Sequence, residues 1–324
     1  MESFPRRILV LKPSSLGDVV HTLPAVAALK SHWSSSEITW LINPEWASLL
    51  EGNSDVTRIK IFPRRELGGL LGWTRFPKWL GTLETPDLAV DFQGLLRTAL
   101  IARCVGSKKI HGLSDAREGA GFFYHQTTRL PLQSQHAVDR YLQLARDITG
   151  TPVEKPVFPL PAGTPPSESI GTPFILLHPF SRGTGKSLTA ADVSQLCRDL
   201  QPYRVILVGG KSTVTDLPEN VTNLLGKTTL AELIWLIRHA EFTVSVDSGP
   251  MHIAAAITSR LLSIHTWSDP QLVGPYNADA SIWKNGAIVQ MRRYDSNSTE
   301  KNTPPNVSQI AAFVRDQISS ARTP

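Results

Sequence analysis

The sequence predicts an α/β protein built from two doubly wound, Rossmann-like domains that face each other across a cleft. The first observation is that short apolar runs alternate with amphipathic stretches along the whole chain, and strands alternating with helices form parallel sheets with right-handed crossovers. The second is the length of 324 residues, which exceeds the usual size of one domain. The third is a proline-rich segment near the middle, with the same strand–turn–helix pattern before and after it.

The expected strands are continuous apolar runs, which is typical of strands buried on both faces. In the first half we expect strands at Ile8–Leu11, Ile38–Ile42 and Leu88–Asp91, and helices at Val19–Lys30 and Leu95–Arg103. In the second half we expect strands at Phe174–Leu177, Arg204–Val208, Phe242–Val246 and Leu261–His265, and helices at Ala190–Leu200 and Leu230–His239. Pro24 lies inside the first helical pattern, so that helix should start late or kink.

The best candidate for a linker is the segment 150–173, which contains seven prolines. Proline lacks an N–H and fixes φ, so this density disfavours both a helix and a central strand. We therefore expect an N-terminal domain at 1–150, a linker at 151–172 and a C-terminal domain at 173–324. A return of the last helix onto the N-terminal domain is left open.

Composition narrows the class of protein. A hydrophobic fraction of 41% and a charged fraction of 19% suit a globular chain, and no apolar run approaches the roughly 18 residues of a membrane span. The N-terminus lacks the apolar core of a secretory signal, so we expect a cytoplasmic protein. Cys104 and Cys197 are far apart and form no metal-binding or disulfide pattern.

The net charge of +5 is unevenly distributed. Residues 1–150 carry 18 Lys and Arg against 14 Asp and Glu, so we expect an anionic partner on the N-terminal half. The chain has no arginine-rich run and no recognisable nucleic-acid-binding module, so we do not expect nucleic acid. A phosphorylated substrate or an anionic membrane surface suits this charge.

The first turn of interest runs from Lys12 to His21 and joins a strand to a helix. It places Asp18 near the helix N-terminus, where a carboxylate can simply cap the helix by accepting backbone N–H bonds. Asp18 could instead act as a base aimed into the cleft. The helix end would keep such a base ionised, so its effect would depend on positioning.

The second turn, His178 to Ser187, is rich in glycine and carries Arg182 and Lys186. It fails as a P-loop because Phe180 occupies the first glycine position, and as a dinucleotide fingerprint because Leu188 occupies the third. A glycine-rich turn with cations at a helix N-terminus can still hold a phosphate. A solvated loop is the alternative.

The third turn, Val246 to His252, follows another buried-type strand. Gly249 allows close backbone approach of a ligand, Pro250 suits the first turn of a helix, and Asp247 can bind hydroxyl groups. A serine hydrolase is disfavoured because the chain contains no Gly-x-Ser-x-Gly. His252 alone would more often be a core histidine.

Together these turns resemble the heptosyltransferases, glycosyltransferase family 9. The first is similar to a Ser-x-x-Gly-Asp-x-x-His signature, through Ser14 or Ser15, Gly17, Asp18 and His21. The third is similar to Asp-[Ser/Thr]-Gly-x-x-His, through Asp247, Ser248, Gly249 and His252. Residues 91–97, 135–140, 225–230 and 269–276 resemble further segments of the heptosyltransferase I branch. The resemblance spans about residues 7–277 in the correct order.

The resemblance implies a GT-B fold and inverting, metal-independent transfer of heptose, without a cofactor. The donor would be ADP-heptose, bound by the C-terminal domain. The acceptor would be a Kdo or heptose of the lipopolysaccharide inner core, a lipid-linked anionic saccharide bound by the N-terminal domain. Asp18 would take the proton of the acceptor hydroxyl, and Lys186 would stabilise the departing diphosphate. The chain has no Asp-x-Asp, which fits a protein cation in place of a metal ion.

The resemblance also implies two sets of binding residues. Donor binding is expected at Ser181, Arg182, Gly185, Asp247, Ser248, Gly249 and His252. Acceptor binding is expected at Ser15, Gly17, Arg64, Arg117 and Arg140, since the planar fork of arginine suits carboxylate and phosphate. Gly209-Gly210-Lys211 stands where heptosyltransferase I has an acidic residue near the ribose. A glycosyltransferase using another nucleotide sugar, and a sugar-nucleotide epimerase of the same fold, therefore stay as alternatives.

Residues 64–80 combine Trp73, Phe76 and Trp79 with Arg75 and Lys78. Three glycines and Pro77 disfavour a regular helix through the whole segment. The aromatic residues can pack into the N-terminal core or form a plain loop. Alternatively they can lie on the inner face of the inner membrane, because aromatics favour the headgroup region and cations favour anionic lipid.

Overall fold

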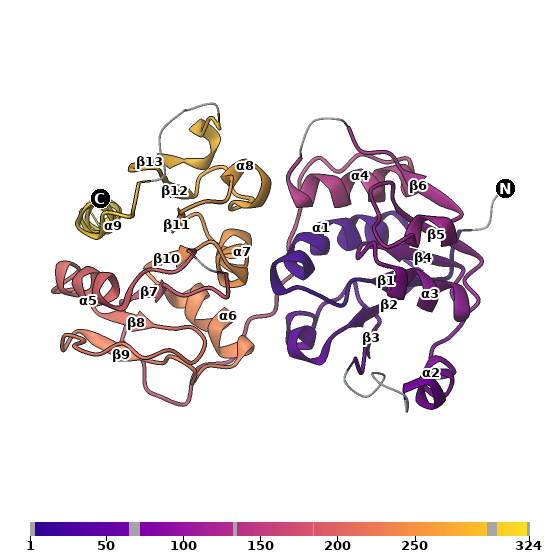
Figure 1. Ribbon diagram of the computed structural model, residues 1–324, viewed down its shortest axis with the longest axis horizontal. Coiled ribbons are helices and arrows are strands. Elements are labelled where there is room, and N and C mark those ends of the chain that lie inside the picture. Colours follow the sequence, from indigo (N-terminus) through magenta and orange to yellow (C-terminus); the bar gives the residue numbers. More distant parts are fainter. Residues whose placement is uncertain (1–3, 65–71, 132–134, 184, 297–302, 323–324) are drawn as a thin grey trace. The chain divides into compact units, whose positions relative to one another are not determined.

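The computed structural model describes residues 4–64, 72–131, 135–183, 185–296 and 303–322. The chain divides into two units, Met1–Pro161 and Ala162–Pro324 (Figure 1). The division falls inside the proline-rich segment, and each unit contains one largely parallel sheet covered by helices. The predicted fold class of two doubly wound α/β domains is confirmed.

The N-terminal unit contains a six-stranded sheet in the order β3-β2-β1-β4-β5-β6. Its strands are β1 (Arg7–Leu11), β2 (Glu37–Ile42), β3 (Arg58–Ile61), β4 (Leu88–Asp91), β5 (Lys109–Leu113) and β6 (Gln126–Thr128). All neighbouring strands pair in parallel. The chain builds outward from β1 in one direction and from β4 in the other, so the switch point lies between these two strands. Ligands bind beside such a point, at the carboxyl ends of the strands.

The helices of this unit are α1 (Leu16–His32), η1 (Pro44–Leu49), α2 (Gly72–Leu80), α3 (Leu96–Cys104), η2 (Ala120–Phe123) and α4 (Ala137–Thr149). Helices α1 and α4 lie side by side and pack on each other (Figure 1). The late start considered for the first helix is wrong, since α1 begins at Leu16 and contains Pro24. A capping box between Ser15 and Asp18 fixes that start.

The C-terminal unit contains a seven-stranded sheet in the order β13-β12-β11-β10-β7-β8-β9. Its strands are β7 (Ile175–His178), β8 (Val205–Leu207), β9 (Val221–Asn223), β10 (Phe242–Val246), β11 (Leu261–His265), β12 (Ser281–Lys284) and β13 (Ala287–Gln290). Only the pair β12–β13 is antiparallel among these. The switch point of this sheet lies between β7 and β10, so the turns that follow these strands meet there.

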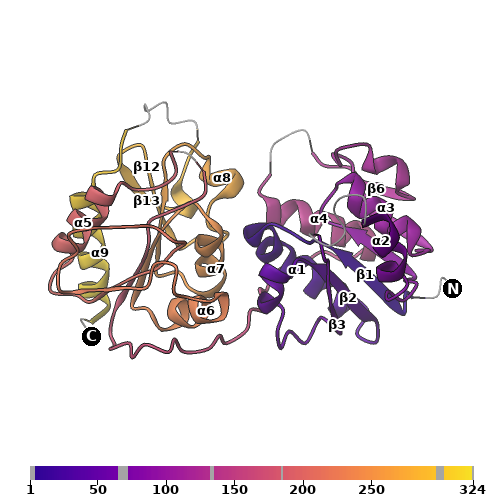
Figure 2. The same cartoon turned by 60° about the horizontal axis from the view of Figure 1, so that its bottom comes forward.

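The helices of the C-terminal unit are α5 (Ala190–Asp199), α6 (Leu230–His239), α7 (Gly249–Ile257), α8 (Pro270–Val273), η3 (Met291–Arg293) and α9 (Val307–Arg322). Helices α5 and α9 cover one face of the sheet, and α6 and α7 cover the other (Figure 2). The buried side of α9, including Ile310 and Val314, belongs to the same core as α5. The last helix therefore belongs to the core of the C-terminal unit. None of the helices in the described ranges has the length and apolar character of a bilayer-spanning segment.

Candidate functional site

Two of the predicted turns meet at the switch point of the C-terminal sheet. The ammonium Nζ of Lys186, from the turn after β7, donates a hydrogen bond of 2.7 Å to Oδ2 of Asp247, which directly follows β10. The Asp247 side chain is 7% exposed and that of Lys186 is 22% exposed. The structure thus brings together a cation and a carboxylate that are 61 residues apart in the sequence.

The carboxylate of Asp247 is ionised. Burial by itself would raise the pKa of Asp247, but the hydrogen bond from Lys186, together with the contributions of the neighbouring His265 and Ser268, outweighs burial and holds the pKa below the usual value. Burial lowers the pKa of the neighbouring His265 to about 3, so that imidazole is neutral near neutral pH. His265 is held between Ser263 and Ser268. Lys186 is therefore the cation that stabilises the Asp247 charge.

The turn after β11 also contacts the turn that carries Lys186. The hydroxyl of Thr266 donates a 2.7 Å hydrogen bond to the carbonyl of Gly185. The next residue, Trp267, places its ring centroid 4.8 Å from Nζ of Lys186, and its side chain remains exposed. Sequence reasoning missed Trp267, although an aromatic residue two positions after a buried-type strand was a signal that could have found it.

The side chains of the expected donor set play different parts. Ser187 closes the turn by accepting from the N–H of Ser181 at 2.9 Å. Arg182 is exposed, His252 is buried in α7, and Gly185 has a φ of +76°, which a glycine adopts at no cost. Thr184 lies outside the described residues.

Ser248 uses its side chain within the protein. Its hydroxyl lies 3.2 Å from Nδ1 of His178 and donates to the carbonyl of Val246 at 3.0 Å. Burial lowers the pKa of His178 to about 4, so this histidine is a neutral hydrogen-bonding partner. What the Ser248–Gly249 turn can offer a ligand is therefore its backbone.

The two helix N-termini beside the pair differ in what they can bind. At α5 the carboxylate of Asp192, in the first turn, accepts from the N–H and the hydroxyl of Thr189. Helix α7 begins at Gly249 and has no acidic residue in its first turn. The N–H groups of a first turn have no partners within the helix, and the helix dipole favours an anion there. The first turn of α7 is therefore suited to a phosphate, and the phosphate site expected in the turn before α5 stays a prediction.

Asp18 occupies the switch point of the N-terminal sheet. Its Oδ2 accepts hydrogen bonds from the backbone N–H of Ser15 at 3.0 Å and from the Ser15 hydroxyl at 2.7 Å. The helix-capping interpretation of Asp18 is therefore correct as far as it goes. The same contacts fix the carboxylate at the carboxyl end of β1, half-buried, with Gly17 buried in the turn beside it. A role as base stays a prediction.

A buried lysine, which sequence reasoning missed, ties the surrounding loops together. Nζ of Lys12 donates to the carbonyl of Phe92 at 3.1 Å and to the hydroxyl of Tyr141 at 2.8 Å. The N–H of Ser14 donates to the side chain of Gln93 at 3.3 Å. These bonds join the turn after β1 to the loop after β4 and to α4. A lysine directly after an apolar strand was the available signal.

The predicted acceptor arginines are only partly brought together. Arg140 of α4 bonds to Asp115, in the loop after β5. Arg117, in the same loop, is exposed, and its backbone N–H donates to the carbonyl of Gly94 at 2.8 Å. Arg64 is exposed in the turn after β3. The bond of Arg140 thus joins α4 to the loop that carries Arg117, whereas Arg64 lies in a different turn.

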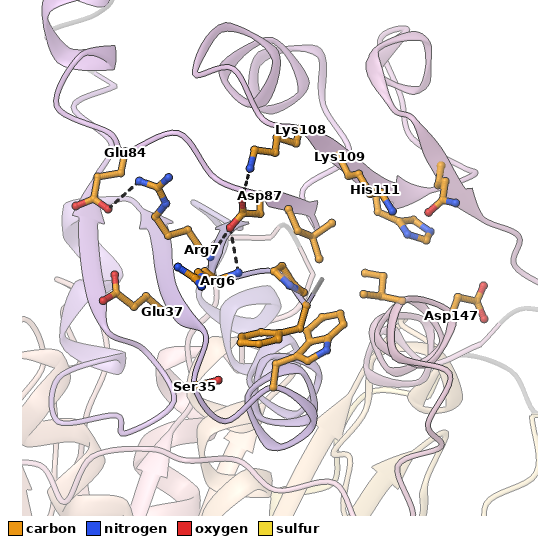
Figure 3. A pocket seen from close by; sticks show the side chains of 16 residues that line it. Arg6, Arg7, Ser35, Glu37, Glu84, Asp87, Lys108, Lys109, His111 and Asp147 are labelled. Carbon is orange, nitrogen blue, oxygen red and sulfur yellow. Dashed lines mark hydrogen bonds and ion pairs between the residues drawn. The ribbon is translucent and has the colours of Figure 1, made fainter. Parts of the chain in front are cut away.

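A hollow of about 1430 Å³ lies at the opposite edge of the N-terminal sheet, where its strands begin (Figure 3). Its walls carry both charge signs, and the charges pair across it. Asp87 accepts from Lys108 at 2.7 Å and from the backbone N–H groups of Arg6 and Arg7. Because this edge is remote from the carboxyl ends of the strands, we assign the hollow no part in the site. In the described part of the chain, no three His, Cys, Asp or Glu side chains are grouped as metal ligands.

Two Rossmann-like units make up a GT-B fold, and each unit carries charged side chains at the switch point of its sheet. The model of glycosyltransferase family 9 (heptosyltransferase) matches residues 75–303. The chain belongs to this family, and it is a glycosyltransferase.

Curated relatives and solved structures agree with this assignment. Lipopolysaccharide heptosyltransferase 1 of Pseudomonas aeruginosa is 27% identical over 289 residues, covering 83% of this chain and 81% of the relative. The lipopolysaccharide core heptosyltransferase OpsX of Haemophilus influenzae is 24% identical over 293 residues, covering 84% and 82%. The E. coli heptosyltransferase WaaC, solved with ADP, superposes with a TM-score of 0.77 at 21% identity, covering 96% of this chain and 99% of WaaC. The last comparison shows the shared GT-B fold.

Proposed function

We propose that this glycosyltransferase transfers heptose from ADP-heptose to the Kdo or heptose of a lipopolysaccharide inner core, with inversion and without a metal ion. The observation that carries the proposal is the Lys186–Asp247 pair beside the N-terminus of α7. In this pair, Lys186 is suited to bind a diphosphate and Asp247 to bind sugar hydroxyls. Both functions fit the glycosyltransferase family to which the chain belongs. The names of the relatives support heptose as the sugar and lipopolysaccharide as the acceptor.

The donor site acts by redistributing charge. When a nucleotide sugar binds, its diphosphate competes with Asp247 for the ammonium of Lys186, and the first turn of α7 offers its backbone N–H groups. The carboxylate of Asp247 then becomes available to accept hydrogen bonds from sugar hydroxyls. Lys186 stabilises the negative charge that grows on the departing diphosphate. This supplies from the protein the positive charge that a metal ion would otherwise provide.

The transfer itself is a single displacement. The acceptor hydroxyl oxygen attacks the anomeric carbon from the face opposite the diphosphate, the bond from that carbon to the diphosphate oxygen breaks, and ADP leaves. Asp18 takes the proton from the attacking hydroxyl. One displacement inverts the configuration of the anomeric carbon. The anionic acceptor would bind to Arg117 and Arg140. Further contacts would come from Ser15 and Gly17 in the turn after β1 and from Arg64 in the turn after β3.

The lipid-linked acceptor places the enzyme at the inner face of the inner membrane, in the cytoplasm. Helix α2 supports a peripheral contact through charge, because Arg75 and Lys78 are exposed on it. Phe76 and Trp79 pack against the N-terminal core instead, and Trp79 donates to the carbonyl of Ile61 at 3.2 Å. Residues 65–71 and the side chain of Trp73 lie outside the described residues. The proposed contact is thus electrostatic and does not need inserted aromatics.

The experiment that tests the function is incubation of the protein with ADP-heptose, with and without a Kdo-bearing acceptor, while released ADP is measured. Release that requires the acceptor supports transfer. Release from another nucleotide sugar instead would support a different donor, which the Gly209-Gly210-Lys211 sequence near the ribose leaves open. Conversion of the sugar without release of ADP would support an epimerase and contradict the proposal.

A further inference from the structure

We propose that Trp267 forms the apolar wall of the donor-sugar subsite and selects the transferred sugar by stacking on its C–H face. The proposal rests on the proposed function and goes beyond it by naming a residue that determines sugar specificity. Trp267 is 59% exposed although it follows a fully buried strand. An exposed indole beside an ionised pair is an apolar surface that a ligand can cover.

The backbone on both sides of Trp267 is fixed. Thr266 is bonded through its hydroxyl to Gly185 at 2.7 Å and through its carbonyl to Nζ of Lys284 at 3.3 Å. Two residues after the tryptophan, Asp269 caps α8 by accepting from the N–H of Gln271 at 2.9 Å. The ring is therefore carried by an anchored turn, which is what a stacking platform requires.

The location of the ring matches the shape of a sugar. Lys186 touches both groups, with its Nζ 2.7 Å from Asp247 and 4.8 Å from the centroid of Trp267. The carboxylate and the indole thus both lie beside the same ammonium group. A pyranose has a rim of hydroxyls and an apolar face of C–H groups, so one sugar can use the carboxylate at its rim and the indole at its face.

Stacking should also contribute to selectivity. A sugar whose hydroxyl projects toward the ring would press a polar group against an apolar surface and leave it without a hydrogen bond. A sugar that presents C–H groups there loses nothing. Trp267 would therefore favour one configuration of the ring over its epimers, a distinction that the Lys186–diphosphate contact cannot make.

The competing explanation is that the indole acts only on Lys186, by a cation–π contact that positions the ammonium for the diphosphate. The two roles predict different effects on the affinity for the free nucleotide. A sugar wall contacts only the sugar, so its loss should weaken binding of ADP-heptose and leave ADP unaffected. A residue that positions Lys186 should affect both ligands equally.

The test compares dissociation constants of ADP and ADP-heptose for the wild type, Trp267→Ala, Trp267→Phe and the control Phe122→Ala, an exposed aromatic in the N-terminal unit. We expect Trp267→Ala to weaken ADP-heptose about tenfold with ADP changed less than about twofold, and Trp267→Phe to keep most of the affinity. Circular dichroism and melting temperature confirm that each variant folds. Equal weakening of both ligands, or no weakening of either, overturns the proposal.

A wrong donor and a wrong role for Trp267 would give different results in this test. If the wild type does not bind ADP-heptose, the proposed donor is wrong. The same comparison is then made with the nucleotide sugar that most raises the melting temperature of the wild type. A selective loss of that sugar over its free nucleotide still supports Trp267 as the sugar wall, and an equal loss still overturns it.

Discussion

Removing Lys186 should cost more stability than removing the charge of its partner Asp247. The reason is the unequal burial of the two side chains, 22% exposed for Lys186 and 7% exposed for Asp247. In Lys186→Met, the Asp247 carboxylate is left without its cation and cannot be rehydrated. In Asp247→Asn, the ammonium can turn toward water, and the new amide can still accept one hydrogen bond.

The expected losses in free energy of unfolding follow from how deeply the remaining partner of each variant is buried. Breaking a fully buried pair by removing one partner costs about 3–5 kcal/mol. We expect about 2–4 kcal/mol for Lys186→Met, because its partner is almost fully buried, and about 1 kcal/mol for Asp247→Asn. The double variant should be more stable than the sum of the single losses predicts, since it leaves no orphaned charge.

The assay is denaturant unfolding of the full chain at neutral pH, with the unfolding transition of the C-terminal unit compared among the four proteins of the cycle. Without Lys186, only the weaker contributions of His265 and Ser268 oppose burial, so the pKa of Asp247 should rise. The loss in free energy of unfolding caused by Lys186→Met should therefore become smaller as the pH falls and the Asp247 carboxylate takes a proton. Equal losses for the two single variants, or strictly additive losses, would refute this account of the pair.

The remaining predictions concern the base, the buried histidine and the membrane. Asp18→Asn keeps the capping geometry, so the melting temperature should hold while kcat falls about 100-fold or more; a near-normal kcat would rule out the base. Burial lowers the pKa of His178 to about 4, so wild-type stability should be lost as the pH falls from about 6.5 toward 4. His178→Gln should show a flatter unfolding profile over that window, and an unchanged slope would contradict the assignment. Replacing both Arg75 and Lys78 with Gln should weaken binding to anionic vesicles and preserve activity on a short soluble acceptor. The control Arg315→Gln on α9 should change neither vesicle binding nor activity. Unchanged vesicle binding of the Arg75 and Lys78 variant would exclude α2 as the contact.

The central strands and the three turns could be predicted because each leaves a local signal. Continuous apolar runs marked β1, β4, β10 and β11 to within a residue or two of their observed bounds. Among the strands that escaped prediction, β6 and β9 are three residues long and lie at the edges of their sheets, whereas β5 and β12 lie inside theirs. Edge strands are partly solvated and carry polar residues, so their apolar pattern is weak.

The composition of the candidate site was harder to predict than its location. The contact between Lys186 and Asp247 depends on β7 and β10 being neighbours, and strand order is a property of the whole sheet that no local pattern encodes. For the same reason, the bonds of Lys12 to Phe92 and Tyr141 could not be foreseen. The capping contact of Asp192 with Thr189 at the start of α5 was likewise not foreseen.

The most direct test of the proposed function is product analysis of the wild type with ADP-heptose and a Kdo-terminated inner-core acceptor, in the presence of EDTA. We expect mass spectrometry to show one heptosyl residue added to the acceptor, and NMR to show an anomeric configuration opposite to that of the donor. An acceptor that stays unmodified would contradict heptose transfer. Retained configuration, or activity that EDTA abolishes, would contradict the proposed mechanism.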